Sequence, residues 1–201
     1  MEAHLTGLLA ELEQYGREND ARQSDHKKKM LNLEPDTARL VYILARSSGA
    51  KRALEIGTSN GYSTIWLASA LAPHGGRVTS IDLSAEKQAM ARENLQRAGL
   101  LESVELVLGK AGTIVKELVG PFDVVFFDAD RLGAAANLEA LMPKLAPSVL
   151  LLADNVTSHP DEIAGYLAAV KKLDAFDHVV VPVGKGLSVA YRGAAPAPQA
   201  G

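Results

Sequence analysis

Short apolar runs alternate with longer amphipathic stretches along most of this chain. Runs rich in valine, leucine, isoleucine and phenylalanine predict β-strands, over residues 52–57, 77–82, 103–108, 122–128, 148–154, 178–183 and 187–192. Stretches with apolar residues at helical spacing lie between them and predict helices, over 61–72, 84–98, 134–146 and 160–173. This alternation predicts an α/β fold in which a mostly parallel sheet of seven strands carries helices on both faces.

Both ends of the chain depart from the alternation. Before the first strand, a charged connector over 18–30 joins two predicted helices, over 3–17 and 36–48. The last two strands are separated only by residues 183–186, which is too short for a crossover, so we expect an antiparallel hairpin at one edge of the sheet. The segment 193–201 is low in complexity and rich in alanine and proline, and we expect it to be a disordered tail.

Length and composition fit one α/β unit. The chain has 201 residues, 47% of them hydrophobic, so we expect a single domain over 1–192 that begins with a helical segment over 1–48. A formal net charge of -3 gives no basic surface for nucleic acid or an anionic membrane, and no run approaches the ~20 apolar residues of a membrane span. The absence of cysteine excludes disulfides and thiolate chemistry. Since the first residues do not resemble a signal peptide, we expect a cytoplasmic protein.

The first predicted strand runs into a glycine loop. Gly57 and Gly61 let the backbone turn sharply and approach a ligand, and the helix that follows presents free N–H groups to a negatively charged ligand group. The loop lacks the G-x-G-x-x-G spacing that favours NAD or FAD. Asp82 ends the second strand, near the ~20-residue distance at which an acidic side chain accepts hydrogen bonds from ribose hydroxyls. The pattern predicts an adenosine-containing cofactor, with a capping or surface carboxylate at Asp82 as the alternative.

Oxygen-bearing side chains end the fourth and fifth strands. Because consecutive parallel strands are neighbours about 4.8 Å apart, Asp128 and the pair Asp154 and Asn155 can converge on one cation. Such ligands suit Mg²⁺, Ca²⁺ or Mn²⁺ rather than Zn²⁺, and they leave positions for water and substrate. Strand-end Asp and Asn residues also cap turns, and the spacing leaves both interpretations open. His159 follows in the next loop, where it either reaches a substrate or is solvated.

Four motifs together resemble one known family. In chain order they are Leu54–Ser63, Phe126–Asp130, Leu152–Val156 and Val181–Leu187. They are similar to motifs of the cation-dependent O-methyltransferases, the family of the catechol and caffeoyl-CoA O-methyltransferases and their bacterial members. The resemblance extends from about residue 30 to residue 192. It implies a Rossmann-like class I methyltransferase fold, S-adenosylmethionine as cofactor, a divalent cation with Mg²⁺ ahead of Ca²⁺ or Mn²⁺, and a homodimer.

The resemblance also implies a role for each motif residue. Contacts to the methionine end of the cofactor would come from Glu55, Gly57, Thr58 and Ser63, contacts to the ribose from Asp82, backbone contacts to the adenine from Ala111, and packing over the cofactor from Leu33. The metal ligands would be Asp128, Asp154 and Asn155, with Asp128 also near the cofactor. The cation would orient a hydroxyl of a small phenolic or catechol-like substrate and lower its pKa, so that the oxyanion attacks the methyl group in line.

Arg131 departs from the family pattern. The family commonly has a lysine base directly after Asp-Ala-Asp, and this chain has arginine there. Because arginine stays protonated and has no acceptor, Arg131 can hold an anionic group or stabilise the oxyanion but cannot act as the base. We expect Asp128 and Arg131 at the reacting centre. Two alternatives stay open: a cofactor-binding protein with lost or altered catalysis, motivated by Arg131, and an NAD-linked oxidoreductase on a Rossmann-type sheet, which the glycine loop disfavours.

Overall fold

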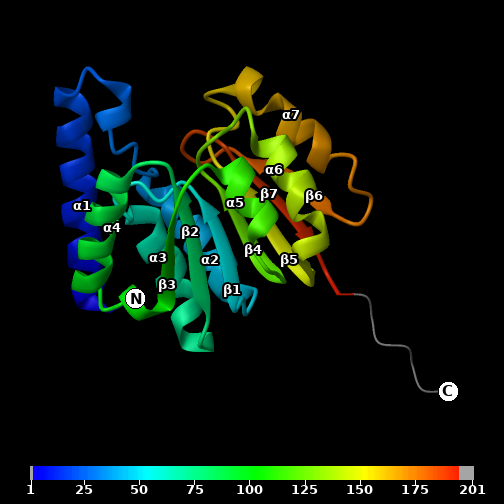
Figure 1. Cartoon of the computed structure of the whole chain (residues 1–201), viewed down its shortest axis with the longest axis horizontal. Helices are drawn as coiled ribbons and strands as arrows, with labels where there is room; N and C mark the ends of the chain where they lie inside the picture. The colour runs from blue at the N-terminus through cyan, green and yellow to red at the C-terminus, as the bar shows by residue number, and fades with distance from the viewer. Residues whose placement is uncertain (1, 195–201) are drawn as a thin grey trace.

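Seven α-helices and seven strands build the part of the chain that the structure, a computed structural model, describes, residues 2–194 (Figure 1). The helices are α1 (Ala3–Arg22), α2 (Pro35–Ser47), α3 (Tyr62–Leu71), α4 (Ala85–Arg97), α5 (Ala111–Glu117), α6 (Ala134–Leu141) and α7 (Pro160–Val170). The strands are β1 (Arg52–Ile56), β2 (Arg77–Asp82), β3 (Val104–Leu108), β4 (Phe122–Phe127), β5 (Leu145–Ala153), β6 (Asp177–Val181) and β7 (Leu187–Arg192). Residues 195–201 of the predicted tail lie outside the described residues.

The strands form one sheet in the order β3-β2-β1-β4-β5-β7-β6. Neighbouring strands from β3 to β5 pair in parallel, whereas β7 pairs antiparallel with both β5 and β6. The predicted α/β fold with an antiparallel edge hairpin is thus confirmed. Strand order reverses between β1 and β4, and ligands of open α/β sheets bind at such a switch point, outside the carboxyl ends of the strands.

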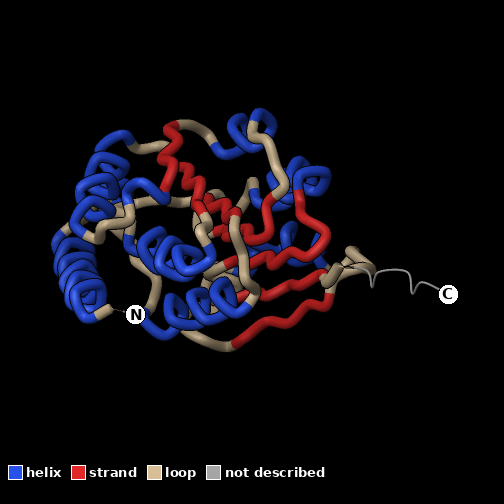
Figure 2. The backbone as a smooth tube through the Cα atoms, turned by 90° about the horizontal axis from the view of Figure 1, so that it is seen from below, coloured by secondary structure: helices blue, strands red, loops and turns tan. Residues whose placement is uncertain are grey.

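Helices cover both faces of the sheet, as Figure 2 shows in the view from below. Side chains alternate between the faces along each central strand. In β4, Val124 and Phe126 belong to the core shared with α1–α4, while Val125 and Phe127 belong to the core shared with α5–α7. Both faces are buried, which is why these strands are continuous apolar runs in the sequence. Within residues 2–194, none of the helices combines the length and apolar character that a bilayer crossing needs.

Several element bounds differ from the predicted ones, and one helix was not predicted. α1 continues to Arg22, inside the predicted charged connector, and Arg22 pairs with Glu18 one turn earlier at 3.0 Å. α6 ends at Leu141, before the predicted end at residue 146, because Pro143 cannot continue the hydrogen-bond ladder of an α-helix. α5 was not predicted, since its seven residues are too few for a helical period to be recognised.

Candidate active site

The loop after β1 lies at the switch point and needs glycine. Gly57 has a φ of +113°, a conformation that side-chain-bearing residues rarely adopt, and its N–H donates to the carbonyl of Ile81 at 2.9 Å. A Cβ at this position would lie 3.0 Å from the Cβ of Ala129 and 3.2 Å from the carbonyl carbon of Asp128. The loop after β1 therefore packs directly on the residues that follow β4.

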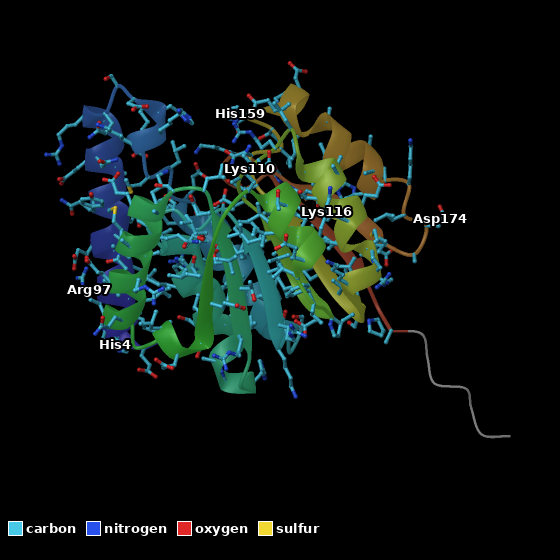
Figure 3. All side chains as sticks on the ribbon, in the orientation of Figure 1. His4, Arg97, Lys110, Lys116, His159 and Asp174 are labelled. Carbon is cyan, nitrogen blue, oxygen red and sulfur yellow. The ribbon has the colours of Figure 1, made fainter. Side chains whose placement is uncertain are left out.

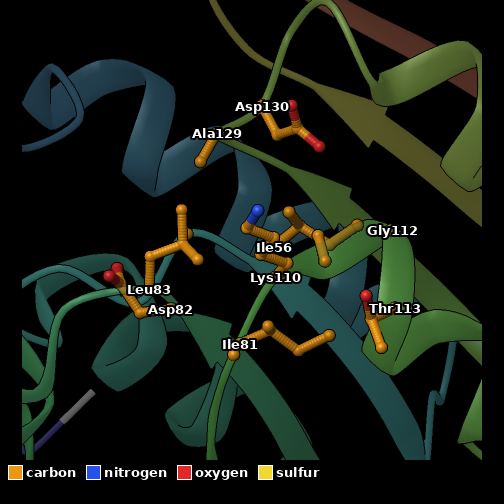
Figure 4. A pocket seen from close by; sticks show the side chains of 12 residues that line it. Ile56, Ile81, Asp82, Leu83, Lys110, Gly112, Thr113, Ala129 and Asp130 are labelled. Atoms are coloured by element: carbon orange, nitrogen blue, oxygen red, sulfur yellow. The ribbon is translucent and has the colours of Figure 1, made fainter.

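A cavity of about 480 Å³ opens beside this loop (Figure 4). Its walls come from the ends of β1 and β2, the residues after β4 and the start of α5. The lining includes three of the predicted cofactor residues, Gly57, Asp82 and Ala111, together with Ile56, Ile81, Leu83, Gly109, Lys110, Gly112, Thr113, Ala129 and Asp130. The volume lies within the ~300–1,000 Å³ range of small-molecule and cofactor sites.

Asp82 is fixed in this cavity by two backbone groups. One carboxylate oxygen accepts from the N–H of Ser59 and the other from the N–H of Ser84, both at 2.8 Å. A carboxylate oxygen can accept more than one hydrogen bond, so acceptor capacity remains for the two hydroxyls of a ribose. The backbone bonds set the orientation of the carboxylate and join the glycine loop to the start of α4.

Four of the five remaining predicted cofactor residues line a second, much smaller space, and the fifth, Glu55, does not. Leu33, Thr58, Ser63 and Asp128 lie among its walls, and its volume is about 10 Å³, room for about one water molecule. The segment Met30–Leu33 forms one wall of this space. This volume is too small for the methionine end of a cofactor.

Glu55 lies beneath the loop in a shell of hydroxyl groups. It is fully buried, and its carboxylate accepts from Ser63 at 2.6 Å and from Thr64 and Ser80 at 2.5 Å each. Burial outweighs these bonds and raises the pKa of Glu55 to about 7. Sequence analysis did not assign Thr64 or Ser80; the available signal is that each is a hydroxyl residue directly before an isoleucine, Ile65 and Ile81.

The raised pKa of Glu55 predicts a specific dependence of stability on pH. The folded state retains this proton up to about pH 7, whereas the unfolded chain releases it near 4.5. The contribution of Glu55 is thus fully present below pH 4.5 and is lost as the pH rises to 7, by at most about 3 kcal/mol. Thermal unfolding midpoints between pH 4.5 and 8 should therefore fall less steeply for Glu55→Gln than for the unmodified protein. If the unfolding midpoints of both proteins changed equally with pH, Glu55 would have an ordinary pKa.

Two carboxylates meet at the ends of β4 and β5. The register pairs Phe127 with Ala153, so that Asp128 and Asp154 directly follow paired residues. Asp154 is 2% exposed; its Oδ2 accepts from the amide of Asn155 at 2.9 Å, and its buried Oδ1 has no partner among the described residues. Burial, and next the negative charge of Asp154, raise the pKa of Asp128 well above its usual range. Burial likewise raises the pKa of Asp154 to about 6.

These features fit a divalent cation. An unpartnered buried carboxylate oxygen beside a second carboxylate is costly, and a hard cation with oxygen ligands relieves both the lost hydrogen bond and the repulsion. Asp128, Asp154 and the amide oxygen of Asn155 could supply two carboxylates and one amide to such a cation. No group of three or more His, Cys, Asp or Glu side chains within residues 2–194 is arranged to hold a metal ion.

Two cationic side chains near the carboxylates are held by ion pairs. Arg131 lies with its Nε and Nη2 each 2.8 Å from Oε2 of Glu162 on α7. Lys185, in the turn between β6 and β7, lies 2.9 Å from Glu34 at the start of α2. Sequence analysis assigned no role to Lys185 or Glu34. The signal available for Lys185 was its position between two glycines in the last family-like motif.

His159 stands at the start of α7, at the end of the molecule where the strands have their carboxyl ends (Figure 3). Its Nδ1 lies 2.9 Å from the hydroxyl of Ser158, which in turn donates to the carbonyl of Asn155 at 3.3 Å. His159 is thus linked to the candidate metal loop through Ser158 rather than through a direct contact with a carboxylate.

The family model described as O-methyltransferase matches residues 5–190. Among curated proteins, the catechol O-methyltransferase of Niastella koreensis is 38% identical over 130 residues, which cover 63% of this chain and 58% of that protein. The catechol O-methyltransferase of Mycobacterium tuberculosis is 41% identical over 115 residues, which cover 57% of this chain and 52% of that protein. The aligned stretch thus spans less than two thirds of the length of either relative.

A solved structure is similar over nearly the whole chain. The O-methyltransferase from Bacillus cereus in complex with S-adenosylhomocysteine is 27% identical and superimposes with a TM-score of 0.79. The superposition covers 92% of this chain and 90% of that one. The similarity therefore includes the helices before β1 as well as the sheet.

Proposed function

Because this chain belongs to the O-methyltransferase family, we propose that it is an S-adenosylmethionine-dependent, divalent-metal-dependent O-methyltransferase. Its substrate is a small phenolic or catechol-like molecule, the class named for its curated relatives. The family match gives no support to an NAD-linked oxidoreductase. A homodimer and a cytoplasmic location stay predictions.

One observation carries the proposal. The cavity that contains Gly57, Asp82 and Ala111 adjoins the carboxylate pair Asp128 and Asp154, since Gly57 packs against the backbone of Asp128 and the next residues, Ala129 and Asp130, line the cavity. A methyl donor and an acceptor hydroxyl must lie within about 3–3.5 Å of each other for transfer, which requires two adjoining sites. The Bacillus cereus relative contains S-adenosylhomocysteine, the product that the donor leaves behind.

Different residues bind the methyl donor and the methyl acceptor. S-adenosylmethionine supplies a methyl group that its sulfonium already activates. Asp82 holds the ribose, Gly57 lets the backbone approach the donor, and Ala111 contacts the adenine. Asp128, Asp154 and Asn155 would hold the divalent cation, whose chemistry there would be to lower the pKa of a substrate hydroxyl. In the transfer, the hydroxyl would lose its proton to water and its oxygen would form a bond to the methyl carbon as the carbon–sulfur bond breaks, with the electron pair passing to sulfur.

Release of S-adenosylhomocysteine tests the proposal. With a panel of catechols and caffeoyl esters we expect turnover in the presence of Mg²⁺ and its loss, by about two orders of magnitude or more, in EDTA, because the cation provides several kcal/mol of charge stabilisation. Restoration of turnover by excess Mg²⁺ is the control for damage by the chelator. Turnover that is equal with Mg²⁺ and with EDTA would contradict metal dependence, and no turnover on any diol would contradict the substrate class.

A further inference from the structure

A buried amide on α6 is bound to a carboxylate in the wall of the 480 Å³ cavity. Asn137 is 2% exposed, and its neighbours on the same face of the helix, Ala134, Leu138 and Leu141, belong to the apolar core. A buried amide lowers stability unless its polar atoms find partners. Nδ2 of Asn137 donates to Oδ2 of Asp130 at 3.1 Å. The partner of this buried group is thus a residue that lines the cavity.

The same amide lies beside the start of α5. Its Oδ1 lies 3.6 Å from the position that a Cβ on Gly112 would take. Gly112 lines the cavity directly after Ala111, which contacts the adenine in the proposed function. Asn137 is therefore adjacent both to Asp130 and to the wall that receives the base, so the Asp130 carboxylate lies close to that wall.

The backbone around Asp130 also sets the direction of its side chain. Asp130 has a φ of +53°, in the left-handed region that aspartate tolerates better than most residues. The N–H of Gly133 donates to the carbonyl of Asp130 at 2.9 Å. A Cβ on Gly133 would overlap Oδ2 of Asp130, so a side chain at this position would displace the carboxylate from Asn137.

The cavity offers few acceptors to an adenine. Among the described residues that line it, side-chain oxygen atoms occur only in Asp82, Thr113 and Asp130. Asp82 holds the ribose in the proposed function, and Figure 4 shows Asp130 on a different side of the cavity. Within residues 2–194, Asn137 makes the one hydrogen bond to the Asp130 carboxylate, so Oδ1 of Asp130 can accept another from a ligand.

We propose that Asn137 is a positioning residue that orients the Asp130 carboxylate to accept a hydrogen bond from the amino group of the cofactor's adenine. This inference rests on the proposed function. The amino group of adenine is a donor, and a carboxylate only accepts. Hypoxanthine has an oxygen in place of the amino group, so two acceptors would face each other. Asp130 thereby selects the base, and Asn137 determines how strongly it does so.

The binding of two ligands tests this proposal without turnover. Calorimetry without metal gives the dissociation constants of S-adenosylhomocysteine and of S-inosylhomocysteine, its hypoxanthine analogue, and their ratio measures base selection. We expect the unmodified protein to prefer the adenine form by about 10-fold or more, the effect of a hydrogen bond to a charged group. Asp130→Asn should remove most of this preference, because an amide can also donate to the hypoxanthine oxygen. Asn137→Leu should lower it by about fivefold, because Asp130 loses its donor.

Two control variants separate positioning from stability. Gln88→Leu removes another buried amide, which donates to the carbonyl of Val107 at 2.8 Å and lies outside the cavity wall. This variant should lower the free energy of unfolding and leave the ratio of dissociation constants unchanged. Thr113→Val removes the other side-chain oxygen that could accept from the base and should also leave the ratio unchanged.

Gly133→Ala breaks the contact between Asp130 and Asn137 without changing the core, so its ratio decides the matter if Asn137→Leu fails to fold. An unchanged ratio in the folded Asn137→Leu, or otherwise in Gly133→Ala, would overturn the positioning role. An unchanged ratio in Asp130→Asn, or equal affinities of the unmodified protein for the two ligands, would overturn the contact with the base. Failure of the unmodified protein to bind either ligand would instead overturn the proposed function.

Discussion

Replacement of Asp154 by alanine is expected to abolish Mg²⁺-dependent methyl transfer, with a loss of about a thousandfold or more, while binding of S-adenosylhomocysteine changes little. Loss of a metal ligand removes several kcal/mol of charge stabilisation, and each ~1.4 kcal/mol is a factor of ten in rate. The binding of the cofactor product should persist because Asp154 does not line the 480 Å³ cavity. Product release assays measure the first quantity, and isothermal titration calorimetry without metal measures the second.

Asp174→Ala is the matched control for Asp154→Ala. Asp174 is an exposed carboxylate in the loop before β6, so its removal changes the net charge equally without touching the site. Thermal unfolding of both variants shows whether any loss of transfer comes from loss of folded protein. If Asp154→Ala lowers transfer and S-adenosylhomocysteine affinity by the same factor, the carboxylate serves the cofactor rather than a cation.

Gly57→Ala is expected to weaken S-adenosylhomocysteine binding at least tenfold. The new Cβ would lie 3.0 Å from Ala129, a residue of the cavity wall, so that the wall must shift by a few tenths of an ångström. A side chain at a positive φ also costs about 1–2 kcal/mol of stability. We therefore expect both a lower cofactor affinity, measured by calorimetry, and a lower free energy of unfolding, measured by chemical denaturation.

Gly49→Ala separates these two effects. Gly49 also has a positive φ, +67°, but a Cβ there meets no atom of the described structure within 4 Å. This variant should lose stability through backbone strain and retain its affinity for S-adenosylhomocysteine. Equal affinities in Gly49→Ala and Gly57→Ala would mean that the close packing of Gly57 on Ala129 does not shape the cofactor cavity.

The sheet could be predicted because its strands are buried on both faces and so appear as continuous apolar runs. The juxtaposition of Asp128 and Asp154 followed from the same pattern, since β4 and β5 are consecutive, parallel and adjacent. The position of Lys185 could not be predicted. It depends on the insertion of β7 between β5 and β6, a long-range pairing that local periodicity does not encode.

The sequence pattern also did not predict short helices or contacts between side chains. α5 forms the wall of the cofactor cavity through Ala111, yet it is too short for its period to be recognised. The partner of Arg131 lies 31 positions away on α7, and nothing in the Asp-Ala-Asp-Arg motif indicates that Glu162 occupies the guanidinium. The family resemblance showed that Arg131 stands where the family commonly has lysine. Its ion pair with Glu162 could be seen only in the folded structure.

The segment Met30–Leu33, beside the small second space, is held by hydrogen bonds that would affect cofactor binding. The hydroxyl of Ser59 donates to the carbonyl of Met30 at 2.7 Å, and the carboxylate of Asp20 accepts from the N–H groups of Met30 and Leu31 at 2.6 and 2.9 Å. These bonds favour the conformation in which the space holds about one water molecule. If only a fraction of molecules has this segment raised at any moment, the apparent dissociation constant exceeds the intrinsic one by the inverse of that fraction. Asp20 lines neither space, yet through these hydrogen bonds it would then contribute to the affinity for the cofactor.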